Sequence, residues 1–240
     1  MLDKDINYKQ LLEFMMHELR SLHEVLDESA TQLSISVKGK RPDMPRLIKH
    51  VNVITEKLLV LYSWLSIADF YLEPDIFIKE EKRRISLHEI FYKTIAHLKG
   101  RIQSKGMHVL LHGNGKFFIR AHRIISIIPY ILLDNAIKYS FSNSKIVISL
   151  MDINPYHVIK VTSYGPYVPK NELIELLKPG VRGGTVKKII ASGNGLGLAL
   201  LKAICDYHGI SLELYSDEQT QIINDIPFSE FCVTLKCKQA

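Results

Sequence analysis

A glycine-rich segment near the carboxyl end of the chain is the first candidate for chemistry. It reads Ser192-Gly193-Asn194-Gly195-Leu196-Gly197-Leu198-Ala199, and apolar residues then recur with helical spacing at Leu200, Ala203 and Ile204. Glycines let backbone N–H groups approach a bound group without a Cβ in the way, and a helix N-terminus favours phosphate. The segment predicts a phosphate-binding helix start. Taken alone, it also fits an ordinary surface turn.

A second candidate segment reads Asn135-Ala136-Ile137-Lys138-Tyr139-Ser140. Asn135, Lys138 and Tyr139 fall on neighbouring positions of one expected helix. An amide oxygen can ligate Mg²⁺, a lysine can neutralise phosphate and an aromatic ring can cover a purine. These residue types predict contacts to a nucleotide and its metal ion. The alternative is a buried helix with common surface residues at one end.

A third candidate segment lies close to the N-terminus and reads His17-Glu18-Leu19-Arg20-Ser21-Leu22. Helical spacing places His17 beside an apolar stripe that contains Met15, Leu19 and Leu22. An imidazole outside such a stripe can attack phosphorus when its nitrogen is unprotonated, and Glu18 could hold the other ring N–H. The alternative is a simple solvent-facing histidine.

The stretch Pro179-Gly180-Val181-Arg182-Gly183-Gly184-Thr185 precedes the glycine-rich segment. Polar, glycine-punctuated loops that lead into a binding site often close over a ligand. We therefore expect a lid over a nucleotide, with Arg182 among the nucleotide-binding residues. A flexible surface loop is the alternative.

Two long helices are expected to carry the histidine. Apolar residues recur at three- and four-residue steps over residues 5–36 and again over 44–71, and glycine and prolines break the pattern between them. One helical hairpin has too narrow a core to stand alone, so we expect two copies to form a dimeric four-helix bundle. The chain is thus expected to be a homodimer.

After Pro74 and the charged run 79–84, the pattern changes to mixed helix and strand. We expect helices over 87–99 and 123–139, and strands over 109–112, 116–119, 145–150, 157–162, 211–215 and 230–235. Helices and strands in this order predict an α/β sandwich with helices on one face of a sheet. The predicted fold class is therefore α+β, with domains at 1–78 and 82–240.

Composition narrows the functional classes. The chain has 240 residues, of which 47% are hydrophobic and 23% charged, and a net charge of +6. No apolar run reaches the roughly 18 residues of a membrane helix, and no secretory signal is visible. Three cysteines without metal-ligand spacing indicate reduced thiols. Because the charges are scattered, we expect no nucleic-acid binding. The lack of a long apolar run predicts no membrane insertion, and the odd number of cysteines without a secretory signal predicts a cytoplasmic protein.

Taken in series, the three segments resemble the H box, the N box and the second glycine box of the sensor histidine kinases of two-component signalling. The resemblance covers nearly the whole chain. It implies a dimerisation and histidine-phosphotransfer hairpin, followed by an ATP-binding domain of the kind shared with DNA gyrase and the Hsp90 chaperone. It also implies ATP and Mg²⁺ as cofactors and the receiver domain of a response regulator as partner.

The resemblance also assigns roles to individual residues. His17 would accept the phosphoryl group, Glu18 would be its base or orienting acid, and Ser21 stands where phosphatase-competent members orient a water. Asn135 would hold Mg²⁺, Lys138 would touch phosphate and Tyr139 would pack on adenine. The implied phosphate loop contains Gly193, Gly195, Leu196, Gly197 and Leu198.

The chain departs from the family pattern at the first glycine box. Ser163 stands where a carboxylate should read adenine, Gly165 is retained, and Tyr167 replaces the second glycine. Ile131 replaces a polar residue four positions before Asn135. Two alternatives follow: an active, divergent ATP-dependent histidine kinase, or a non-catalytic phosphotransfer protein or pseudokinase scaffold. Since 16 residues precede His17, we expect sensory input from a separate protein, from a small ligand or from a region outside this sequence.

Overall fold

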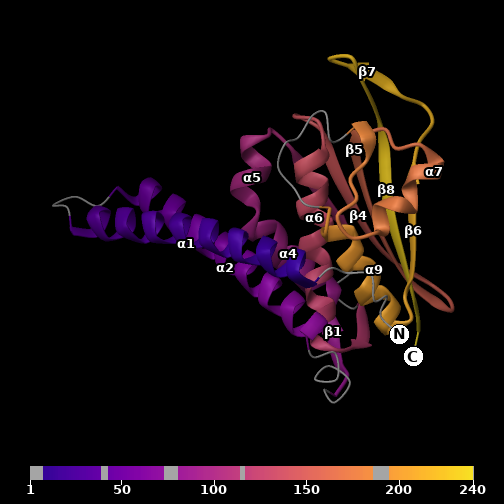
Figure 1. Cartoon of the computed structure of the whole chain (residues 1–240), viewed down its shortest axis with the longest axis horizontal. Helices are drawn as coiled ribbons and strands as arrows, with labels where there is room; N and C mark the ends of the chain where they lie inside the picture. The colour runs from indigo at the N-terminus through magenta and orange to yellow at the C-terminus, as the bar shows by residue number, and fades with distance from the viewer. Residues whose placement is uncertain (1–7, 39–42, 73–80, 114–116, 186–194, 240) are drawn as a thin grey trace. The chain divides into compact units, whose positions relative to one another are not determined.

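A computed structural model of the chain describes residues 8–38, 43–72, 81–113, 117–185 and 195–239. The chain divides into two compact units, Met1–Lys79 and Glu80–Ala240. Figure 1 shows both units.

The first unit is a helical hairpin of α1 (Tyr8–Lys38) and α2 (Met44–Leu72). Asp43 caps the start of α2, because its carboxylate Oδ1 accepts a hydrogen bond from the Arg46 backbone N–H at 3.2 Å. The Arg46 guanidinium in turn donates to Gln32 Oε1 on α1 at 3.0 Å. These contacts join the two helices at the closed end of the hairpin.

The hairpin leaves much of its apolar surface uncovered. Leu22 is buried, with 7% of its surface exposed. By contrast, Met44, Val51, Leu58 and Leu65 of α2 are between 47% and 58% exposed. These four residues are spaced by seven, so they form one stripe along the helix. We call these four residues the α2 stripe.

The second unit contains two sheets among its described residues. The smaller pairs β1 (Arg83–Ser86) with β3 (Phe118–Ala121). The larger has the strand order β2-β4-β5-β8-β6, with β7 attached to β8, and only the β2–β4 pair is parallel. Its strands are β2 (His108–His112), β4 (Lys145–Ile153), β5 (Tyr156–Pro166), β6 (Ser211–Ser216), β7 (Gln221–Ile223) and β8 (Ile226–Lys238).

Helices form the other layer of this unit, and Figure 1 shows α4, α6 and α9 on one face of the larger sheet. The helical segments are α4 (Leu87–His97), α5 (Lys99–Ser104), η1 (Arg123–Ile127), α6 (Ile128–Tyr139), α7 (Lys170–Leu173), η2 (Glu175–Leu177) and α9 (Gly197–His208). The predicted mixed α/β architecture is confirmed. The expected helix over 87–99 ends at His97, and the expected helix over 123–139 begins as a 3₁₀ turn.

The core lies between the helices and the sheet. Leu133 and Ile137 of α6 and Ile146 and Ile148 of β4 are at most 1% exposed. Burial alternates along β4, so one face of the strand meets the helices. Removing these apolar side chains from water contributes a free energy of about 25 cal/mol per Å² of buried surface, which stabilises the packing of α6 on the sheet.

The end of α9 is fixed by a histidine and a glycine. Gly209 ends the helix in the left-handed conformation, with φ +64°. Burial lowers the pKa of His208 to about 4, so the ring is neutral. Its Nε2 accepts a hydrogen bond from the His122 backbone N–H at 3.2 Å, and its Nδ1 lies 2.8 Å from the Ile204 carbonyl oxygen. These bonds fix α9 against the residue that precedes η1.

Candidate functional site

The side chain of Asn135 lies directly against the start of α9. A Cβ added to Gly197, the first residue of α9, would lie 3.3 Å from both Oδ1 and Nδ2 of Asn135. Asn135 Nδ2 is buried and has no hydrogen-bond partner among the described residues. A buried amide normally has a partner, so this atom marks a place where a ligand or water would complete the site. Two predicted segments thus meet here.

Gly195 is in close contact with the loop that contains Arg182. Its φ is +65°, and an added Cβ would lie 2.7 Å from the Gly180 carbonyl carbon, 2.8 Å from the Val181 nitrogen and closer still to the Val181 oxygen. The Gly180 N–H donates a hydrogen bond to the Gly195 carbonyl oxygen at 3.2 Å. Only glycine suits this position, both for its backbone angle and for the space around it.

The same loop brings Arg182 to Tyr139. Burial raises the pKa of the Tyr139 hydroxyl, while the charge of Arg182 and a hydrogen bond with its side chain oppose the rise. Lys138 Nζ lies 5.6 Å from the centre of the Tyr139 ring. Two cations therefore lie beside one half-buried aromatic ring at the end of α6, an arrangement suited to a phosphorylated ligand.

Strand β5 lies against the end of α6. A Cβ on Gly165 would lie 3.5 Å from the Tyr139 carbonyl oxygen, and the Phe141 N–H donates to the Tyr164 oxygen at 3.1 Å. Ser163 is 9% exposed and lies two residues before Gly165, on the same face of the strand. The structure therefore places Ser163 on the helix-facing side of the sheet.

Two departures from the family pattern are also located by the structure. Ile131 lies one turn before Asn135 and is 6% exposed, so an apolar side chain fills that position. Tyr167 follows β5 and is half-buried, and its N–H donates to the Pro227 oxygen at 2.8 Å. Neither residue supplies a carboxylate or an amide beside Asn135.

The α9 start lacks a side-chain cap among the described residues. Leu196 is its N-cap residue, and Leu196 and Leu198 are half-buried. The first N–H groups of a helix need partners, and an anion can supply them. Gly193 lies outside the described residues.

The remaining predicted residues belong to the first unit. His17, Glu18 and Ser21 lie on α1, and their side chains are outside the described part of the chain. The site on the second unit is therefore built from α6, β5, the loop over 180–182 and the start of α9.

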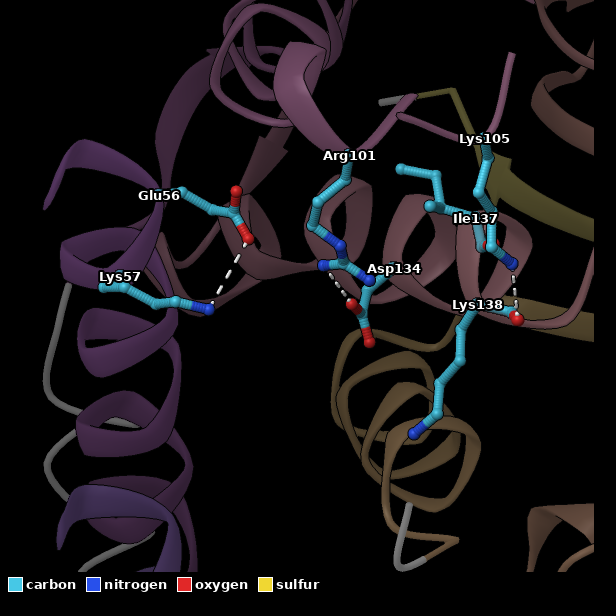
Figure 2. Close-up of polar contacts among 7 residues, drawn as sticks. All are labelled: Glu56, Lys57, Arg101, Lys105, Asp134, Ile137 and Lys138. Carbon is cyan, nitrogen blue, oxygen red and sulfur yellow. Dashed lines mark hydrogen bonds and ion pairs between the residues drawn. The ribbon is translucent and has the colours of Figure 1, made fainter. Parts of the chain in front are cut away.

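Two contacts that hold α6 were not predicted from the sequence. Lys105 Nζ donates hydrogen bonds to backbone carbonyl oxygens at the end of α6, and Arg101 forms an ion pair of 2.7 Å with Asp134 on the same helix (Figure 2). The available signal was the pair Lys105-Gly106 ahead of a strand, because glycine there permits a tight turn.

Comparisons with known proteins indicate which proteins this chain is similar to. Residues 122–230 match the family model described as histidine kinase-, DNA gyrase B-, and HSP90-like ATPase. The signal transduction histidine-protein kinase/phosphatase MprB of Mycobacterium leprae is 28% identical over 205 residues, which are 80% of this chain. The chain spans 37% of the length of that relative.

Solved structures of histidine kinases share the fold. The Acinetobacter baumannii histidine kinase AdeS aligns over 93% of this chain and 98% of its own, with a TM-score of 0.55 and 18% identity. The catalytic domain of histidine kinase ThkA covers 67% of this chain and 97% of its own, with a TM-score of 0.55 and 20% identity. The second unit contains a domain of the histidine kinase-, DNA gyrase B- and HSP90-like ATPase family. The chain is a relative of sensor histidine kinases.

Within the described ranges, no helix is both long enough and apolar enough to cross a membrane. The same residues contain no cluster of three His, Cys, Asp or Glu side chains that could bind a metal ion.

Proposed function

We propose that this chain is the core of a cytoplasmic histidine kinase that uses Mg-ATP to phosphorylate His17 and passes the phosphoryl group to an aspartate of a response regulator. The observation that carries the proposal is the contact between Asn135 and Gly197. It joins a buried amide without a described partner to a helix start without a side-chain cap. Such a pair suits a metal-bound polyphosphate.

The proposed reaction is a phosphoryl transfer to nitrogen. An unprotonated ring nitrogen of His17 forms a bond to the γ-phosphorus, and the bond to the β-phosphate oxygen breaks, releasing ADP. When bound, Mg²⁺ would neutralise phosphate charge, with Asn135 as its protein ligand. A carboxylate oxygen of the regulator then takes the phosphoryl group, which frees the imidazole.

The chain's own residues supply positioning and charge. Lys138 and Arg182 lie beside Tyr139, so they can neutralise phosphate next to a ring that covers the base. Glu18 follows His17 in sequence and is proposed to orient its imidazole. Positioning and charge neutralisation account for most of phosphoryl-transfer catalysis, so these groups suffice for the chemistry.

The adenine contact is the first point to test. We expect Mg-ATP to bind the full chain with a dissociation constant in the micromolar to sub-millimolar range. Ser163→Asp should tighten this binding by about tenfold or more, because a carboxylate accepts a stronger hydrogen bond from an amine than a hydroxyl does. Titration calorimetry measures both values. Ser163→Asn is the matched control, because it adds size without charge. Unchanged or weaker binding by the Asp variant contradicts the assignment of Ser163.

A second candidate is a phosphotransfer protein or scaffold without kinase activity. Ser163, Tyr167 and Ile131 favour it, because each replaces a residue that the family uses near the nucleotide. Lack of ATP binding by a folded chain would support this candidate. His17 would then exchange phosphoryl groups between receiver domains, and phosphorylated receiver domains would be the donors to assay.

The hairpin is proposed to dimerise through the α2 stripe. Residues exposed at seven-residue spacing on one helix need a partner helix, and a second copy completes a four-helix bundle. We expect Leu58→Asp to give monomers, because it places a charge in the middle of that interface. Light scattering measures the mass. Asn52→Asp adds the same charge at an exposed position off the stripe and should leave a dimer. A dimer that survives Leu58→Asp contradicts the bundle.

A further inference from the structure

The carboxyl end of α6 is capped by one lysine from another segment. Lys105 Nζ donates hydrogen bonds to the carbonyl oxygens of Ile137 at 2.7 Å, Lys138 at 3.0 Å and Ser140 at 3.3 Å. Figure 2 shows the Lys105 side chain reaching the end of this helix from a neighbouring segment. A lysine ammonium has three donors, and here each has an acceptor.

This cap supplies hydrogen bonds to two carbonyl groups at the end of the helix. The last carbonyl groups of any helix lack partners within it. In α6, the Ala136 oxygen accepts from the Ser140 N–H at 3.0 Å, and Lys105 takes the next two. The ammonium also lies at the negative end of the helix dipole, which adds a favourable electrostatic term.

The backbone around Lys105 is itself held in place. Its carbonyl oxygen accepts a hydrogen bond of 2.9 Å from the Asn143 N–H, in the turn that follows α6. Gly106 has φ +63°, and a Cβ there would overlap Asn143 Oδ1. The backbone at Lys105 and Gly106 is therefore held against the turn that follows α6, the helix that Lys105 caps.

A second contact holds the same helix one turn earlier. Arg101 Nη1 on α5 pairs with Asp134 Oδ1 at 2.7 Å, and both side chains are about two-thirds buried (32% and 30% exposed). Asp134 immediately precedes Asn135. Together, Arg101 binds the residue before Asn135 and Lys105 binds the carbonyl of Ser140 after Tyr139, so the stretch with the three candidate ligands is held at both ends.

We propose that Lys105 is a positioning residue for the nucleotide site, one that aims Lys138 and Tyr139 by fixing the backbone on which they sit. Two of the carbonyl groups that Lys105 binds belong to Ile137 and Lys138. A shift of this helical turn would therefore move the side chains of Lys138 and Tyr139 together. The inference rests on the proposed nucleotide binding of this site. It adds a residue that does not itself touch the ligand.

The test compares Lys105→Met with Lys105→Arg and with Lys99→Met in the full chain. Methionine keeps the length of the side chain and removes the donors. Arginine restores donors, and Lys99 is an exposed lysine at the start of α5, so its substitution controls for the loss of one charge. Mg-ATP affinity is measured by calorimetry well below each variant's unfolding midpoint, where a purely structural role would leave affinity unchanged.

We expect Lys105→Met to weaken Mg-ATP binding by about tenfold, the size of effect typical for loss of an outer-shell partner. The affinity of Lys99→Met should equal that of wild type, and the affinity of Lys105→Arg should be close to it. Equal affinities of Lys105→Met and wild type, or equal losses in the two methionine variants, overturn the inference. If wild type binds no nucleotide, the proposed function fails first. If Lys105→Met does not fold, Lys105→Gln decides: affinity below that of Lys99→Met supports the inference, and equal affinity overturns it.

Discussion

Replacing Gly195 with alanine should reduce Mg-ATP affinity by about a hundredfold or more. A non-glycine residue at φ +65° costs about 1–2 kcal/mol, and the new Cβ would also overlap backbone atoms of Gly180 and Val181. The chain relieves that overlap by moving the loop, which takes Arg182 away from Tyr139 and displaces the start of α9. Each tenfold loss corresponds to about 1.4 kcal/mol, so the combined cost reaches this range.

Gly209 offers the matched control for this substitution. It has φ +64°, almost the angle of Gly195, but a Cβ there would meet nothing within 4 Å. Gly209→Ala therefore carries the backbone strain without the overlap, and it lies at the other end of α9. We expect it to lower the midpoint of thermal unfolding while leaving Mg-ATP affinity within about twofold of wild type. Equal losses of affinity in both variants would mean that strain, and not the loop contact, is responsible.

Local patterns explain why much of the fold was predictable. Apolar residues at three- and four-residue steps predicted the two long helices, and α2 begins at Met44 as expected. The pattern of residue types similarly predicted strands over 145–150 and 157–162, which lie within β4 and β5. The hydrophobic pattern is a property of a single segment, so one sequence is enough to detect it.

Contacts between distant segments explain what was missed. The break at Leu98, two residues before Gly100, was not predicted, and Leu98 itself is fully buried. The cap from Lys105 to the end of α6 joins residues more than thirty positions apart. The pair Lys105-Gly106 marks a turn but not the helix that the lysine caps, since that contact depends on how the two segments pack.

The candidate site shows the same division. The residue types at Asn135 and Gly197 indicated a nucleotide site, yet their contact is visible only in three dimensions. The position of Arg182 beside Tyr139 likewise needed the fold. Residue type suggests the chemistry, whereas the approach of α9 to α6 decides whether those groups can act on one ligand.

The largest expected effect belongs to His17. We expect His17→Gln to abolish acid-labile phosphorylation of the chain, because an amide nitrogen has no lone pair available to attack phosphorus, whereas a neutral imidazole has one. Glutamine is a good helix former, so α1 should persist. The measurement is incorporation of the γ-phosphoryl group of labelled ATP, with acid and alkaline stability of the product compared.

The control for His17 lies on the same helix. His23 is an exposed histidine of α1, six residues further along, so His23→Gln should keep full phosphorylation. Acid-labile phosphate retained on His17→Gln excludes His17 as the acceptor. Wild type could gain no phosphate from ATP and still gain it from a phosphorylated receiver domain, while His17→Gln gains it from neither. In that case the chain transfers phosphoryl groups but does not take them from ATP. That pattern would separate phosphotransfer from kinase activity, because both functions need the same imidazole and only the kinase needs the nucleotide site.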